Sequence, residues 1–189
     1  MMILGGSGRV LALALLLFIG GMQSALAHAL PGSVLFLSHD QGQMNVTILL
    51  PIEDLVIAAP ALKALEDLDG GQDITPAQQT QIGAYFAAHL KLQTEDGVIA
   101  LELIEATIKT AGNAEVGTYN ELTIQLTGTS AADMPLFPMR LSYDAVMHEV
   151  RNHRATVYWK DPTGMVSGVA EFGYRRIGGK VQPVLITRP

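Results

Sequence analysis

The amino-acid sequence predicts a mainly β fold, an antiparallel β-sandwich (Ig-like) with one or two helices inserted between the strands. Three observations support this prediction. Apolar and polar residues alternate with a period of two over most of residues 28–189, which is typical of strands with one buried face. Turn-forming residues separate these runs, and a few segments show helical spacing instead. The chain contains no cysteine, so packing rather than disulfide bonds must stabilise the fold.

The strands follow from this alternation and from the turns between them. The expected strands cover residues 34–38, 44–50, 90–93, 98–105, 122–127, 141–150, 155–160, 166–174 and 181–186. The first two flank Asp40-Gln41-Gly42 and the next two flank Thr94-Glu95-Asp96-Gly97. Both turn sequences predict hairpins.

Two helical segments are expected between the second and third strands. Thr75 can cap the free amides of a helix that begins at Pro76. One face of this helix carries Ile82, Tyr85, Phe86, His89 and Leu90. A weaker helix covers residues 53–68 and is broken or kinked near Pro60.

The N-terminal 27 residues have the features of a secretory signal peptide. Arg9 precedes an apolar run over residues 10–21, and Ala25-Leu26-Ala27 fits a cleavage site. The run is shorter than the roughly 20 residues of a membrane-spanning helix, so we expect cleavage after Ala27 rather than a retained anchor. No transmembrane segment is expected in residues 28–189, which should form a single extracytoplasmic domain. The sequence thus predicts a periplasmic protein or, as the alternative, a secreted one.

The net charge and the motifs of the sequence limit the classes of function that the protein can have. The chain carries 12 basic and 18 acidic side chains, a formal net charge of −6, which argues against nucleic-acid binding. A metal cation or a basic partner fits this balance better. Residues 28–189 contain neither a cysteine nor a Gly-x-Ser-x-Gly motif, so we expect no enzyme, although a carboxylate pair for hydrolysis stays open.

His28 is the first candidate metal ligand. Cleavage after Ala27 would make it the N-terminal residue, with an α-amine and an imidazole that can chelate one ion. The alternative is a flexible polar residue with no ligand role. His39 and His89 have structural explanations, beside a turn and on an apolar helix face.

His148 and His153 are the second candidates. They lie five residues apart rather than the four of the HExxH motif, which places them about 140° apart around a helix. This excludes a zinc-protease helix. In one continuous strand they would point to opposite faces, whereas a hairpin turn at Arg151-Asn152 would place them on one face, close enough to bind one metal. A structural role in the sheet and a pH-sensitive docking role are the alternatives, and Asp144 and Glu149 could orient the imidazoles.

Two short motifs carry a family resemblance. Residues 28–33 (His-Ala-Leu-Pro-Gly-Ser) and residues 141–150 (Leu-Ser-Tyr-Asp-Ala-Val-Met-His-Glu-Val), with His153 downstream, resemble the extracytoplasmic N-terminal region of bacterial HupE/UreJ-like membrane proteins. Members of that family continue into several membrane helices and are associated with nickel or other metal acquisition. The matching positions are His28, His148, Glu149 and His153. Because no such helices follow up to Pro189, the resemblance implies a companion of a membrane transporter rather than the permease itself.

The sequence therefore predicts a soluble periplasmic accessory protein that binds a copper or nickel ion through His28, His148 and His153 for a membrane partner. The alternative is a metal-free structural or interaction module that docks on a membrane protein.

Overall fold

The structure, a computed structural model, describes residues 31–114, 116–130, 136–173 and 176–187. It is mainly β with few helices, as the sequence predicted. The predicted signal peptide and His28 lie outside the described residues. Among those residues, no helix combines the length and the apolar character that crossing a membrane requires.

The larger sheet has six strands in the order β5-β6-β2-β1-β8-β9. Its strands are β1 (Ser33–Asp40), β2 (Gln43–Pro51), β5 (Glu102–Asn113), β6 (Gly117–Thr129), β8 (Ala155–Lys160) and β9 (Val166–Phe172). All neighbours in it are antiparallel except β1 and β8, which run parallel. The expectation of purely antiparallel pairing is therefore wrong for this pair, because β8 follows a long excursion through the second sheet rather than a hairpin.

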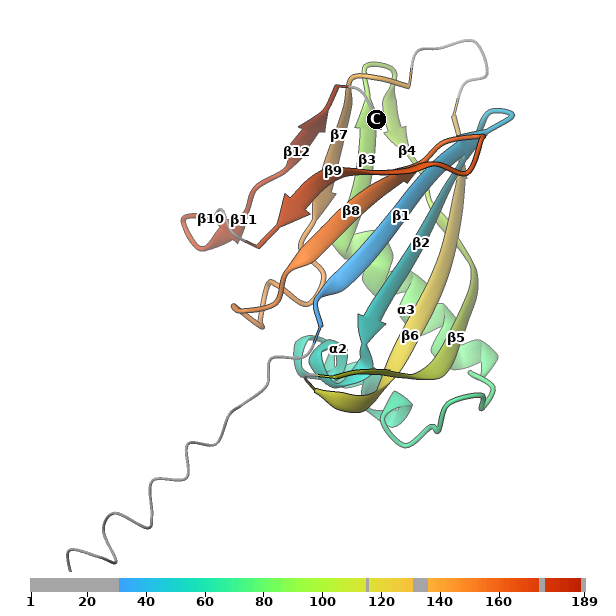
Figure 1. Cartoon of the computed structure of the whole chain (residues 1–189), viewed down its shortest axis with the longest axis vertical. Coiled ribbons are helices and arrows are strands. Elements are labelled where there is room, and N and C mark those ends of the chain that lie inside the picture. The colour runs from blue at the N-terminus through green and yellow to red at the C-terminus, as the bar shows by residue number, and fades with distance from the viewer. Residues whose placement is uncertain (1–30, 115, 131–135, 174–175, 188–189) are drawn as a thin grey trace, which may run out of the picture.

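The second sheet has four strands in the order β12-β7-β3-β4. They are β3 (Leu90–Thr94), β4 (Gly97–Ile99), β7 (Met139–Tyr143) and β12 (Val184–Ile186), and a separate two-stranded ribbon joins β10 (Arg176–Ile177) to β11 (Lys180–Val181). This sheet lies behind the upper part of the six-stranded sheet (Figure 1). The buried side chains of both sheets belong to one hydrophobic core.

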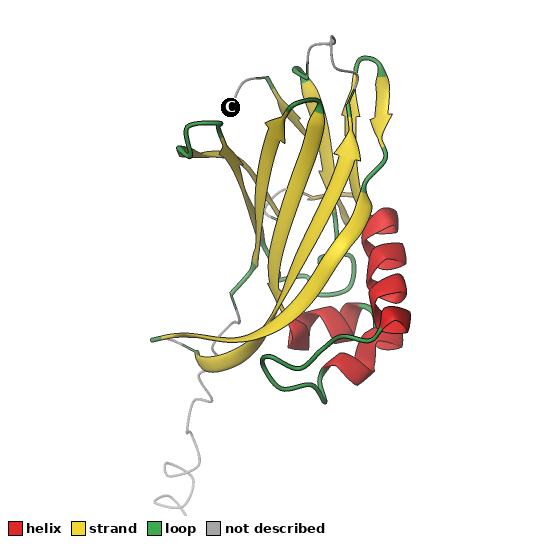
Figure 2. Cartoon of the chain, turned by 90° about the vertical axis from the view of Figure 1, so that its right-hand side faces the viewer, coloured by secondary structure: helices red, strands yellow, loops and turns green. Residues whose placement is uncertain are grey.

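The helices close the lower end of this core (Figure 2). They are α2 (Ile52–Ala58), the 3₁₀ helix η1 (Pro60–Leu65) and α3 (Pro76–His89). The break at Pro60 and the cap at Thr75 are confirmed, and the capping box is completed by Gln78. Gln79 fixes α3 to the six-stranded sheet, since its Nε2 donates to the carbonyl of Ala106 at 2.9 Å.

The first predicted hairpin is confirmed. β1 and β2 are joined by Gln41 and Gly42, whose φ angles of 49° and 78° are both positive, as in the type I′ turns that match strand twist. The second hairpin, β3 and β4, is shorter than predicted. The expected strand over residues 98–105 is wrong because the chain leaves the hairpin at Ala100 and begins β5 in the other sheet at Glu102.

The last predicted strand is also divided. The sequence pattern predicts one strand over residues 181–186, but β11 ends at Val181 and β12 begins at Val184. Pro183 lies between them, and proline has no amide hydrogen with which to continue a ladder.

Candidate histidine site

The loop between β7 and β8 carries both histidines for which the sequence predicted a metal site. The predicted strand over residues 141–150 is wrong, since β7 ends at Tyr143. Residues 145–147 are all 0 % exposed, and three consecutive buried side chains do not fit the alternation of a half-buried strand. Residues 144–154 contain no strand, so the two histidines lie neither on one continuous strand nor on the two strands of a hairpin at Arg151-Asn152.

A tight turn centred on Val146 sets the path of this loop. Val146 has a φ of 64°, a rare conformation for a β-branched residue, and the amide of Met147 donates to the carbonyl of Ala145 at 2.7 Å. The phenolic oxygen of Tyr85, on α3, accepts the amide hydrogen of Val146 at 2.8 Å. Burial raises the pKa of Tyr85 to about 12. Backbone strain of this kind is found where surrounding contacts over-determine the conformation, often at functional sites.

The turn brings His148 against His89, the last residue of α3. The two imidazole rings are stacked, with centroids 4.2 Å apart and planes inclined by 12°. Tyr85 supports the pair from the helix, with its ring centroid 4.6 Å from that of His89 and 6.1 Å from that of His148. His148 is exposed, and the side chain of His89 is 22 % exposed. Two imidazoles from distant parts of the chain are therefore presented together at the surface.

Asp144 orients both rings of this histidine pair. Its carboxylate Oδ1 lies 2.8 Å from Nδ1 of His89, and its backbone carbonyl lies 3.2 Å from Nδ1 of His148. Because both partners are acceptors, each Nδ1 carries the hydrogen and each neutral ring keeps a lone pair on Nε2. Among the described residues, neither Nε2 atom has a hydrogen-bond partner. Metal-binding histidines are commonly held in this way, by a carboxylate or carbonyl on the other ring nitrogen.

A small pocket opens beside the histidine pair. Its volume is about 220 Å³, and His89, Lys91, Ser142 and Asp144 supply polar lining from α3, β3 and the end of β7. His89 is therefore accessible from this pocket, whereas His148 does not line the pocket but is exposed to solvent.

His153 belongs to a separate and buried network. Its Nδ1 lies 2.7 Å from Oδ2 of Asp54 on α2. Its Nε2 lies 2.8 Å from Oγ of Ser33 at the start of β1, and the Ser33 amide donates to the same nitrogen at 3.2 Å. The Tyr143 hydroxyl in turn donates to Ser33 Oγ at 3.0 Å, and burial raises the pKa of that tyrosine well above its ordinary value. The network links β1, α2, β7 and the loop before β8.

Ser33, His153 and Asp54 are hydrogen-bonded in the same sequence of side chains as the serine, histidine and aspartate of a hydrolase triad. Ser33 and His153 are only 1 % and 3 % exposed, however. A substrate carbonyl cannot reach the serine oxygen in this arrangement, because the Ser33 hydroxyl is buried, donates to Nε2 of His153 and accepts from the Tyr143 hydroxyl. The network therefore stabilises the fold.

The structure divides the predicted ligands between different places. His148 lies at the surface, His153 lies in the core with both ring nitrogens hydrogen-bonded, and His28 lies outside the described residues. Glu149 is exposed, and the Asp144 carboxylate bonds His89 rather than either predicted ligand, while only its backbone carbonyl contacts His148. The sequence did not predict a site at His89. Its place on the apolar face of the predicted helix indicated a structural role only.

Within the described residues, no group of three or more histidine, aspartate or glutamate side chains is placed to hold a metal ion. No family model matches the chain, and no curated protein matches it.

Proposed function

We propose that this chain is an exported, non-enzymatic accessory protein that binds a copper or nickel ion in the periplasm and passes it to a membrane partner. The observation that carries the proposal is the surface pair His89 and His148, with both Nδ1 atoms hydrogen-bonded to Asp144 and both Nε2 atoms available. In this proposal His89 takes the place of the buried His153. We also propose that the chain is related to HupE/UreJ-like proteins, which are associated with metal acquisition, and that its two sheets form an immunoglobulin-type sandwich.

The two imidazoles of the pair lie close together, and a rearrangement of His148 would allow both to bind one ion. Imidazole nitrogens bind zinc at about 2.0–2.1 Å, so two of them on one ion lie roughly 3.0–3.4 Å apart. The ring centroids of His89 and His148 are 4.2 Å apart and the ring planes are inclined by only 12°, so the Nε2 lone pairs, which lie in the ring planes, do not converge on one point in the stacked arrangement. Binding a common ion requires the exposed His148 ring to turn out of the stack. Water and the predicted N-terminal chelate of His28 would fill the other positions.

The ligand chemistry favours copper or nickel. Imidazole suits Cu, Ni and Zn, and affinity at a given nitrogen site rises towards Cu²⁺ in the first-row series. Calcium and magnesium prefer sites made of oxygen ligands. The absence of enzymatic activity is proposed because the serine and histidine of the triad-like network are buried.

The test is a titration with CuCl₂ and NiCl₂ followed by calorimetry. The protein is produced with its own leader, and mass spectrometry identifies its N-terminal residue. His89→Ala and His148→Ala are compared with His39→Ala, which removes a half-buried histidine bonded to Ser130. Circular dichroism checks that each variant is folded.

We expect one ion per chain, with affinity reduced at least tenfold in His89→Ala and His148→Ala and unchanged in His39→Ala. Placing one extra residue before His28 weakens binding further if the N-terminal chelate contributes. Equal binding by all variants, or no binding by the unmodified protein, rejects the proposed site.

The second candidate is a metal-free docking module, and exposed apolar side chains favour it. Val166 on β9 and Leu185 on β12 are 47 % and 53 % exposed, and Met165 is 64 % exposed. Chemical cross-linking to membrane proteins in intact cells would test this candidate: loss of a cross-link in Val166→Lys but not in His148→Ala supports it.

A further inference from the structure

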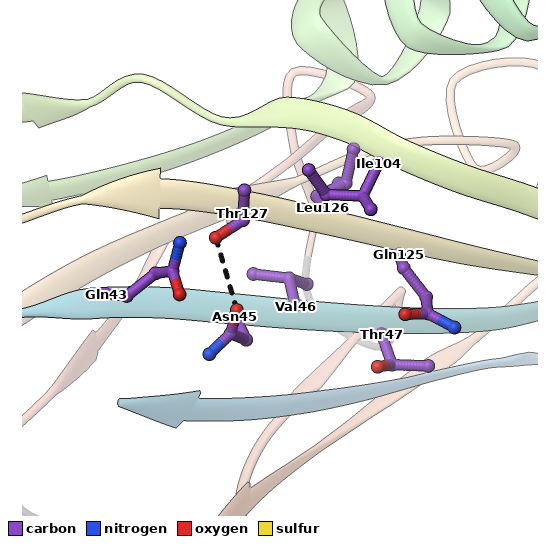
Figure 3. Close-up of a pocket in the computed structure, with 8 residues that line it drawn as sticks. All are labelled: Gln43, Asn45, Val46, Thr47, Ile104, Gln125, Leu126 and Thr127. Atoms are coloured by element: carbon purple, nitrogen blue, oxygen red, sulfur yellow. Dashed lines mark hydrogen bonds between the residues drawn. The ribbon is translucent and has the colours of Figure 1, made fainter. Parts of the chain in front are cut away.

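A shallow groove crosses the solvent face of the six-stranded sheet, away from the histidine pair. Its volume is about 340 Å³, and Figure 3 shows its lining residues on β2, β6 and the start of β5. The lining consists of Gln43, Asn45, Val46, Thr47, Ile104, Gln125, Leu126 and Thr127. The groove is separate from the proposed copper or nickel site, because its lining contains no histidine and no carboxylate.

The polar side chains of the groove are placed in rows by the strand register. Thr47 lies opposite Gln125, and Asn45 lies opposite Thr127. The hydroxyl of Thr127 lies 3.2 Å from Oδ1 of Asn45 and 3.3 Å from the carbonyl of Met44 and shares its hydrogen between them, so the NH₂ group of Asn45 points away from Thr127 (Figure 3). Within the described part of the chain, the side chains of Gln43, Thr47 and Gln125 make no hydrogen bond.

A β-bulge adds an apolar contact at the rim of the groove. The register between β5 and β6 shifts between Leu103 and Glu105, which leaves Ile104 without a paired residue. Ile104 is 63 % exposed although it is a large apolar residue. Bulges are common next to binding sites, where they re-aim a side chain.

Aromatic side chains continue the same row across the sheet. Phe36 on β1 pairs with Thr47 and with Tyr158 on β8, and the two rings are stacked with centroids 5.5 Å apart. The row from Gln125 to Tyr158 spans four strands, which is about 14 Å at the usual strand spacing. Both aromatic residues are partly exposed.

These features fit one class of ligand. None of the lining residues is ionisable, but the exposed Glu102 and Glu105 on β5 lie opposite Thr127 and Gln125 at the edge of the groove. These carboxylates and the net charge of −6 disfavour an anion. Amide side chains both donate and accept hydrogen bonds, as sugar hydroxyls do, while Ile104 and the aromatic pair suit the C–H faces of sugar rings. We infer that this groove binds a short neutral oligosaccharide, and this inference does not depend on the proposed metal site.

The test is calorimetric titration of the full chain with cellohexaose, maltohexaose and chitohexaose, and with hexagalacturonate as an acidic comparison. EDTA is present throughout, so that metal binding does not contribute. The variants are Asn45→Ala and Gln125→Ala, and the matched control is Thr123→Ala, which lies on the same face of β6 outside the groove.

We expect at least one neutral hexasaccharide to bind, with each groove variant weakening binding about tenfold and Thr123→Ala leaving it unchanged. The His89→Ala/His148→Ala double variant should also bind normally, which separates this site from the metal site. Binding of no neutral sugar, binding of hexagalacturonate alone, or equal binding by Asn45→Ala and Gln125→Ala overturns the inference.

Discussion

Replacing His153 by alanine should destabilise the protein more than any surface histidine substitution. The imidazole is enclosed, with 0 % of the side chain exposed, and bonds Asp54 at 2.7 Å and Ser33 at 2.8 Å. Losing the bond to the carboxylate costs about 1.5–3 kcal/mol and the serine bond about 1 kcal/mol. The vacated ring volume adds a cavity cost, so we expect a loss of about 4 kcal/mol in the free energy of unfolding.

Urea denaturation followed by fluorescence measures this loss. The chain has one tryptophan, Trp159 on β8, which is 6 % exposed and therefore sensitive to unfolding. Tyr143→Phe removes only the hydroxyl that donates to Ser33 and should cost about 1 kcal/mol. His39→Ala serves as the control, because its half-buried ring bonds only Ser130 among the described residues.

The reasoning about the buried network is refuted if His153→Ala unfolds within about 1 kcal/mol of the unmodified protein with the same dependence on urea. That result would mean that water already satisfies these groups in the folded protein. With a typical stability of about 5–15 kcal/mol for a domain, the expected loss should also lower the melting temperature clearly.

Two further predictions concern stability. Above pH 10 the unfolded chain loses the Tyr85 proton, whereas the folded chain keeps it because the pKa of Tyr85 is raised to about 12. Tyr85 therefore contributes its full stabilisation below pH 10, and this contribution falls by about 2 kcal/mol as the pH approaches 12. The raised pKa of the buried Tyr143 adds a further fall of the same sign. Urea titrations at pH 9 and 11.5 should show this fall, and a Tyr85→Phe variant with an undiminished fall would contradict the assignment. Gly32→Ala places a Cβ 2.3 Å from the carbonyl oxygen of Arg154 and should cost about 1–3 kcal/mol by thermal unfolding. Gly168→Ala, whose nearest neighbour is 3.9 Å away, is the control, and equal effects of the two substitutions would be contrary to this packing argument.

Local signals in the sequence predicted local structure well. The turn at Gln41-Gly42, the cap at Thr75 and the break at Pro60 each depend on a few adjacent residues. The mainly β class followed from the alternation of apolar residues. These features were predictable because the chemistry that determines them lies within one turn or one strand.

Long-range pairing was not predictable in the same way. Alternation shows which face of a strand is buried but not which strand lies beside it, so the parallel contact of β1 with β8 gave no sequence signal. The apolar residues 145–147 suggested a strand, yet all three are buried in a turn held by Tyr85 from α3. The partners of His148 and His153 depend on these contacts, and the sequence therefore did not show that His148 stacks on His89 while His153 bonds Ser33 and Asp54.

The two histidines of the β7–β8 loop have complementary positions. His153 and its partners Ser33 and Asp54 fix one end of the loop in the core, while Tyr85 and Asp144 fix the other end beside α3. A loop held at both ends keeps His148 beside His89, so that only the exposed His148 side chain has to turn in the proposed metal binding, which limits the entropy lost. His153→Ala should therefore weaken metal binding only as far as it loosens the loop, whereas His148→Ala should abolish the pair and leave the stability of the fold nearly unchanged.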